Sequence, residues 1–243
     1  MDKKLFLIKP ERIKLYCNQP IEILIYGHIM EINLKKNLMM KMLDQVPNLG
    51  WTWNALHEGA KTAKKAKNFD KKELQDLFDN KISNIISTFN DKLDEDMYVI
   101  FNAENNKDLG TTDTVKTLIL SRLKASENYK SIIKTSLFFM AQPRNAYDAF
   151  TQVMKTSNKI WEIAGDTSSG GTFYSKRLIL SGVYSSTLAH WLAKETRTIG
   201  ESEYFLDRRL DDVKNIGKIS KQSVGVFEKT KRELGSILTK KYR

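Results

Sequence analysis

The fold is decided by residues 158–212, NKIWEIAGDTSSGGTFYSKRLILSGVYSSTLAHWLAKETRTIGESEYFLDRRLDD. Apolar residues recur there at helical spacing in three segments, at 158–163, 173–194 and 201–214. A Ser/Gly loop at 165–172 separates the first segment from the second. The pattern predicts three consecutive helices and no strand.

The same helical spacing extends upstream. Further helices are expected at 32–46, 52–66, from 71 onward with a bend near Asn80, at 113–123, 129–140 and 146–164. A chain of 243 residues with 41% hydrophobic residues is long enough to bury a substantial core. We therefore expect an all-α bundle.

Bulk composition excludes several classes of protein. Cys17 is the single cysteine, so no intrachain disulfide forms, and three scattered histidines give no metal-ligand spacing. No apolar run approaches the roughly 18 residues of a spanning helix. The net charge of +11 favours an anionic partner, either nucleic acid or an acidic membrane surface.

The central stretch also carries a family pattern. It contains W-x-x-A-G-D-x-S at 161–168, an aromatic-Tyr pair at 173–174, a basic-Arg pair at 176–177, Tyr184, and F-L-x-x-R at 205–209. These motifs resemble the COQ9 family of ubiquinone biosynthesis proteins over roughly residues 38–243. That family is similar in fold to TetR-type regulators, binds lipid, and presents isoprenoid quinone intermediates to a hydroxylase.

The resemblance implies a lipid cavity between the helices of the body. Its expected lining consists of Leu118, Phe138, Met154, Trp161, Ile179 and Val183. Long, flexible apolar side chains suit ligands of variable shape. Composition alone favours an ordinary helical core, so that alternative stays open.

The resemblance also implies a surface that receives the hydroxylase. The expected partner-binding residues are Ile160, Asp166, Phe173, Tyr174 and Arg177. Two departures from the family pattern affect it: the family usually has Trp where Phe173 stands, and it usually has an acidic residue near the position of Gly170. The alternative is a hydrophobic staple with a surface arginine. We interpret the other matching residues as packing and dimer-face residues, which implies a homodimer: Tyr184, Phe205, Leu206 and Arg209.

Residues 218–243 form a basic amphipathic pattern. They contain eight basic and two acidic residues, a net +6 of the total +11. We expect a helix that lies on an anionic membrane, with a docked terminal helix as the alternative. The expected membrane-binding residues are Val224, Phe227, Leu234, Ile237 and Leu238 on the apolar face, and Lys221, Arg232 and Lys240 on the basic face.

The chain divides into four expected parts. Residues 1–29 are expected to be disordered or a mis-assigned start, with a strand-like IEILIY piece as the alternative. Residues 30–110 resemble a helix-turn-helix end, 111–217 the lipid-binding and dimerisation body, and 218–243 the membrane-associating helix.

Two functions are weighed. The first is a lipid-binding accessory protein of ubiquinone biosynthesis, with no catalytic residues, no cofactor beyond its bound lipid, and no metal. It would be peripheral on the bacterial inner membrane or on the matrix face of the mitochondrial inner membrane. The alternative is a TetR-type DNA-binding regulator, which the carboxylates Glu73, Asp76 and Asp79 of the third helix oppose, because they would face phosphates. No phosphate loop or nucleophile motif indicates an enzyme.

Overall fold

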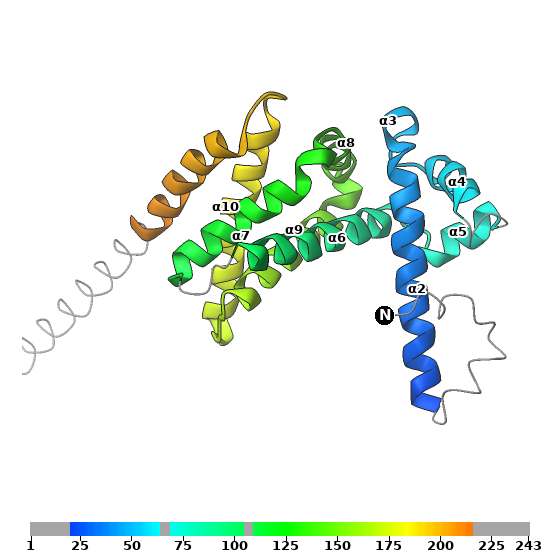
Figure 1. Cartoon of the computed structure of the whole chain (residues 1–243), viewed down its shortest axis with the longest axis horizontal. Coiled ribbons are helices and arrows are strands. Elements are labelled where there is room, and N and C mark those ends of the chain that lie inside the picture. The colour runs from blue at the N-terminus through cyan, green and yellow to red at the C-terminus, as the bar shows by residue number, and fades with distance from the viewer. Residues whose placement is uncertain (1–19, 64–68, 105–108, 216–243) are drawn as a thin grey trace, which may run out of the picture. The chain divides into compact units, whose positions relative to one another are not determined.

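The computed structural model describes residues 20–63, 69–104 and 109–215, with side chains from Tyr26 onward (Figure 1). These residues form helices and contain no strand, as predicted. The chain divides into two compact units. Unit 1 comprises the residues up to Leu93 together with Ser131–Ala149, and unit 2 comprises Asp94–Lys130 and the residues from Phe150 onward.

Unit 1 is built around one long helix. Its elements are α2 (Pro20–Leu43), α3 (Val46–Leu49), α4 (Trp53–Thr62), α5 (Lys71–Leu77), the first half of α6 (Ile82–Ala103), most of α8 (Lys130–Met140), η3 (Pro143–Asn145) and the start of α9 (Ala146–Ile163). Its fully buried side chains include Leu38, Met39, Met42, Leu56, Leu74, Phe78, Ile85 and Ile86. Figure 1 shows α4 beside α2, the long blue helix, and α5 beside α4.

The crossing of α2 and α4 depends on one glycine. A Cβ atom at Gly59 would lie 2.6 Å from the carbonyl oxygen of Lys41, which is backbone and cannot move aside alone. Thr52 caps α4, because its hydroxyl accepts from the backbone N–H of Ala55 at 3.2 Å. The cap and the glycine together fix where α4 begins and how closely it packs.

The predicted third helix is in fact two helices. α5 begins with a capping box, in which Glu73 N–H donates to Asp70 and Asp70 N–H donates to Glu73, each at 2.8 Å. Asp79 and Asn80 then adopt left-handed backbone, with φ of 52° and 56°, before α6 starts. A full break therefore replaces the expected bend, since consecutive left-handed residues cannot continue a right-handed helix.

The expectation of disorder or a mis-assigned start for residues 1–29 is wrong over 20–29, because these residues form the beginning of α2. The IEILIY piece lies in α2, a helix that begins at Pro20, so it is not a strand. Proline is favoured at the first helical position, where its missing N–H costs nothing. Residues 1–19 and 216–243 lie outside the described ranges, and with them the expected membrane-associating helix. Residues 131–149, which were expected within the body at 111–217, group with unit 1 instead.

Unit 2 holds the second core. It contains the end of α6, α7 (Thr111–Ser126), η2 (Glu127–Tyr129), most of α9, α10 (Gly170–Leu192) and a helix at 199–215. Its buried cluster is Met97, Phe101, Val115, Leu118, Ile119, Ile160, Leu180, Val183, Tyr184 and Leu206. The predicted helices at 173–194 and 201–214 are confirmed to within a few residues.

A buried ion pair crosses this core. Arg122 Nε donates to Asp94 Oδ1 at 2.6 Å, and the two side chains are 2% and 9% exposed. Thr156 donates to the other carboxylate oxygen at 3.0 Å, while Arg122 also donates to Ser126 at 2.7 Å. Because a buried charge without its partner is strongly destabilising, this network ties α6, α7 and α9 into one arrangement.

Two glycine substitutions test the packing of the helices. Gly59→Ala should lower the free energy of unfolding by about 1–3 kcal/mol, because the added methyl group overlaps the α2 backbone. Gly182→Ala should raise it by roughly 0.5–1 kcal/mol, because the site lies within α10 and a Cβ there meets nothing within 4 Å. Urea unfolding measures both changes, and equal effects would contradict the close approach at Gly59.

Candidate functional site

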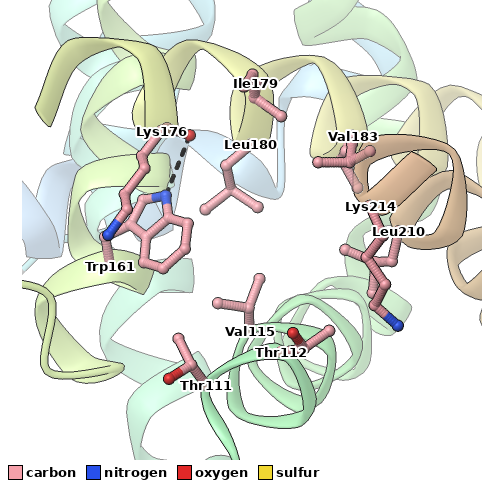
Figure 2. Close-up of a pocket in the computed structure, with 11 residues that line it drawn as sticks. Thr111, Thr112, Val115, Trp161, Lys176, Ile179, Leu180, Val183, Leu210 and Lys214 are labelled. Atoms are coloured by element: carbon pink, nitrogen blue, oxygen red, sulfur yellow. Dashed lines mark hydrogen bonds between the residues drawn. The ribbon is translucent and has the colours of Figure 1, made fainter. Parts of the chain in front are cut away.

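An apolar pocket of about 210 Å³ lies within unit 2. Four helices line it: α7 below, α9 and α10 to one side and above, and the helix at 199–215 at the other side (Figure 2). The lining residues are Thr111, Thr112, Val115, Trp161, Lys176, Ile179, Leu180, Val183, Leu210, Val213 and Lys214. Most of these are aliphatic or aromatic, so the interior suits an apolar group.

One end of the pocket is formed by Trp161. Its indole N–H donates to the carbonyl oxygen of Lys176 at 3.2 Å, so the ring's polar atom is satisfied within the protein (Figure 2). The Lys176 ammonium lies 5.1 Å from the ring centroid, within cation–π range. Lys214, at the opposite end, pairs with Asp211 at 3.1 Å. The apolar interior is thus bounded by an ammonium group at each end.

Asp166 holds the turn beside this pocket. Its carboxylate, 3% exposed, accepts from the Lys176 ammonium at 2.7 Å, from Arg177 Nη1 at 3.0 Å and from the Ser168 hydroxyl at 2.6 Å. Gly165, with φ of 75°, ends α9 and lets the chain reverse toward Asp166. The loop is therefore clamped to the first turns of α10.

The charges around Asp166 shift its protonation equilibrium. The hydrogen bond from the Lys176 ammonium, followed by that from Ser168, holds the pKa of the Asp166 carboxyl far below the usual aspartate value of 3.8. The carboxylate is therefore ionised across the physiological range. An ionised Asp166 keeps both basic side chains of the pair in place.

Arg177 is buried, contrary to the surface position considered from the sequence. Only 3% of it is exposed, and its Nε donates to Asn158 at 2.7 Å while its guanidinium stacks 3.3 Å from the Phe173 ring centroid. Phe173 in turn meets Tyr174 edge to face at 5.2 Å. Tyr174 is 67% exposed, so it is the member of this corner that a partner would touch first.

The six predicted lipid-binding residues separate into three groups. Trp161, Ile179 and Val183 line the pocket. Leu118 is completely buried in the adjoining core, and the Met154 sulfur accepts a hydrogen bond from Ser181 at 3.3 Å on the α9–α10 contact. Phe138 lies in unit 1 and is 78% exposed, so it does not line this pocket.

The predicted partner-binding residues are likewise divided by burial. Ile160 is fully buried and Asp166 nearly so, and they support the corner from within. Phe173 and Tyr174 carry its accessible surface. The eight predicted membrane-binding residues, from Lys221 to Lys240, lie outside the described ranges.

Sequence reasoning missed the pocket residues contributed by α7 and the helix at 199–215. These are Thr111, Thr112 and Val115 from the first, and Leu210, Val213 and Lys214 from the second. Each helix has an ordinary apolar stripe, and only the fold brings their ends together with Trp161. Helical spacing identified the stripes but held no signal for this juxtaposition.

Two features are absent from the part of the chain that the structure describes. No helix there is both long and apolar enough to cross a bilayer. No group of three or more His, Cys, Asp or Glu side chains within those ranges has the geometry to hold a metal ion.

The fold and the pocket define the class of protein. A solved TetR transcriptional regulator from Nitrosomonas europaea has a similar structure, with a TM-score of 0.55, 15% identity, and coverage of 74% of this chain and 97% of that one. The chain is thus an all-α protein with a TetR-like fold. At this identity the likeness concerns the fold alone.

The sequence comparisons are more specific than the fold, because they point to one family. Residues 146–217 match the COQ9 family model. The ubiquinone biosynthesis protein COQ9 of Xenopus tropicalis is 24% identical over 205 residues, covering 83% of this chain and 64% of the relative. The rat and human COQ9 proteins are each 23% identical over 197 residues, covering 79% of this chain and 62% and 61% of the relatives. The resemblance to the COQ9 family is confirmed, and the chain spans a little under two thirds of the relatives' length.

Replacing the carboxylate of the clamp tests its role and its pH dependence. Asp166→Asn should lower the free energy of unfolding at neutral pH, because Asn keeps an acceptor but loses the charge. Since the folded pKa is depressed, the contribution of Asp166 is complete above 3.8 and declines as the pH falls below that value toward the folded pKa. The difference between the two proteins should therefore narrow in acid.

Urea unfolding at neutral pH and at about pH 3 measures this difference. Asp211→Asn is the control, because the exposed Asp211–Lys214 pair contributes little to stability. A deficit for Asp166→Asn that is equally large at both pH values would contradict the ion-pair role.

Proposed function

We propose that this chain is a lipid-binding accessory protein of ubiquinone biosynthesis. It binds an isoprenoid quinone intermediate in the unit 2 pocket and presents it to a hydroxylase. The pocket is the observation that carries the proposal, because three residues predicted for a lipid cavity line it. The names of the COQ9 relatives supply the pathway and, as mitochondrial proteins, favour the matrix face of the inner membrane.

Pocket size limits what part of such a ligand is enclosed. A dry cavity of about 150 Å³ holds a benzene molecule. A pocket of about 210 Å³ therefore takes a ring-sized group or a short branched segment, and not a whole polyprenyl tail. We propose that the pocket holds one such segment while the remainder of the ligand stays outside it.

The lining favours an apolar segment over a charged one. Leu180 and Val183 are nearly buried, and their contact with hydrocarbon releases ordered water. Thr111 and Thr112 offer hydroxyl groups at the pocket's edge. These hydroxyls, with the lysines at the two ends, are positioned to meet the polar oxygens of a quinone precursor.

The hydroxylase is proposed to dock at the corner formed by Phe173 and Tyr174. Aromatic residues dominate the energetics of protein interfaces, and Tyr174 presents a large amphipathic surface. The clamp formed by Arg177 and Asp166 makes this surface rigid before a partner arrives, which lowers the entropic cost of binding. The homodimer and peripheral membrane association remain parts of this proposal, and the chain itself is proposed to be non-catalytic.

A charge placed at the pocket mouth tests ligand binding. Ile179 lines the pocket and is 49% exposed, so Ile179→Arg should fold normally yet weaken binding of an isoprenoid quinone at least tenfold, because the guanidinium enters the apolar path. Leu178→Arg is the matched control, since Leu178 directly precedes Ile179 in α10, is 57% exposed and does not line the pocket.

Binding is measured by fluorescence quenching with a short-chain ubiquinone, and by native mass spectrometry with lipid extraction on protein from its own cells. Equal affinity of Ile179→Arg and Leu178→Arg would remove the pocket assignment. Absence of any co-purifying isoprenoid would overturn the lipid-binding function itself.

Removing the exposed ring of the corner tests partner docking. Tyr174→Ala should weaken capture of the cell's quinone-pathway hydroxylase by about 2 kcal/mol, the order of a hot-spot residue. Tyr204→Ala is the control, because Tyr204 is equally exposed, at 69%, on the helix at 199–215. Capture is measured by pull-down and titration, and full-strength binding by Tyr174→Ala would exclude the corner.

A further inference from the structure

The turn between α8 and α9 exposes three large apolar side chains. Leu137 is 42%, Phe138 78% and Tyr147 79% exposed. Large apolar side chains exposed close together in the chain are candidates for an interaction site. We call residues 137–147 the α8–α9 turn.

The backbone of this turn is held firmly. Asn145 is buried and donates through Nδ2 to the carbonyl oxygen of Phe139 at 2.7 Å, while its N–H donates to Gln142 at 2.8 Å. Ser83 donates to Asp148 at 2.6 Å and ties the start of α9 to α6 within unit 1. Met140 is buried beneath the turn. The exposed rings are therefore presented outward by a fixed scaffold and cannot fold back onto the core.

The exposed charge of the turn is positive. Arg144 is the single charged side chain within the turn, and it is exposed. The next carboxylate along the chain, Asp148, is half-buried and accepts from Ser83. The turn therefore offers a guanidinium group beside its exposed rings.

Exposed apolar rings beside an exposed arginine match the chemistry of a membrane interface. Phenylalanine and leucine enter the acyl region, tyrosine prefers the headgroup level, and arginine binds phosphate. Each basic residue near an anionic surface adds about a tenfold effect at most on partitioning. A protein partner would more commonly meet a patch with mixed charges at its rim.

We propose that the α8–α9 turn is a membrane contact, inserting Phe138, Leu137 and Tyr147 into an anionic phospholipid surface with Arg144 at the phosphates. This contact is separate from the one expected for residues 218–243, and it lies in unit 1 whereas the pocket lies in unit 2. It gives Phe138 a role in lipid contact at the outer surface. Ligand binding in the pocket does not depend on it.

A site-specific probe tests insertion directly in the full chain. Phe138→Cys, in a Cys17→Ser background, carries an environment-sensitive fluorophore, and Tyr204→Cys in the same background is the matched control. Vesicles of phosphatidylcholine with roughly 30% phosphatidylglycerol should shift the emission at position 138 to shorter wavelength and leave position 204 unchanged. Pure phosphatidylcholine vesicles should give a smaller shift.

Three outcomes would overturn the proposal. The first is no shift at position 138 although the chain sediments with the anionic vesicles, and the second is no sedimentation at all. The third is a shift without vesicles that grows with protein concentration, which would identify a second copy of the chain as the occupant of this surface.

A second measurement uses unlabelled variants. Phe138→Ser with Tyr147→Ser should weaken partitioning to the same vesicles about tenfold or more, since two buried rings are lost. The matched double variant Leu178→Ser with Tyr204→Ser should partition like the parent. Circular dichroism checks folding, and quinone binding should be unchanged in the turn variant, so this proposal and the pocket can fail separately. Unweakened partitioning of the turn variant would contradict insertion.

Discussion

The ion pair between Asp166 and the basic residues 176 and 177 links the parts of the candidate site. Asp166 lies just past α9, and Lys176 and Arg177 lie in the second turn of α10, so the pair fixes the angle at which the chain re-enters the bundle. Two consequences follow from one contact. The Lys176 carbonyl is placed to accept from Trp161, which sets the pocket's end wall, and Arg177 is placed under Phe173, which supports Tyr174. The end wall of the pocket and the proposed docking corner are therefore connected through Asp166.

The ion pair buried in the core of unit 2 does not line the pocket, whose ends are bounded by Lys176 and Lys214. Thr156 and Ser126 form hydrogen bonds with the Asp94–Arg122 pair. Burial raises the pKa of the nearby Tyr184 phenol, which therefore stays neutral. An unpaired charge in the core would draw water toward the pocket and weaken its affinity for hydrocarbon. A self-contained polar network allows Leu180 and Val183 to remain dry lining residues. The buried pair is thus a condition for an apolar pocket in a chain with so many charges.

Helical periodicity predicted where the helices lie, but it did not predict which residues they bury or which partners those residues meet. The break at Gly165 and the two helices after it were predicted because glycine and a change of apolar spacing coincide there. The left-handed backbone of Asp79 and Asn80 was not predicted. Aspartate and asparagine are common both at helix ends and in loops, so their presence did not distinguish a bend from a full break. A surface position for Arg177 was the alternative left open from the sequence, because arginine is seldom buried without a partner, and its partner Asp166 is eleven residues away. Phe138 was expected in the lining of the lipid cavity, but it is 78% exposed. On one helix Met140 and Phe138 are two residues apart and point to different sides.

The two proposed lipid contacts differ in the force that drives them, and salt separates them. The pocket binds through burial of apolar surface, so its affinity for a neutral quinone depends weakly on ionic strength. The contact proposed for the α8–α9 turn combines aromatic insertion with attraction between Arg144 and anionic headgroups, which salt screens over about a Debye length. Because the chain carries a net +11, the membrane would be approached through long-range attraction and then held by local insertion. A protein that takes its ligand from a bilayer needs both features: a basic surface that binds anionic lipid, and an apolar pocket whose affinity depends little on charge.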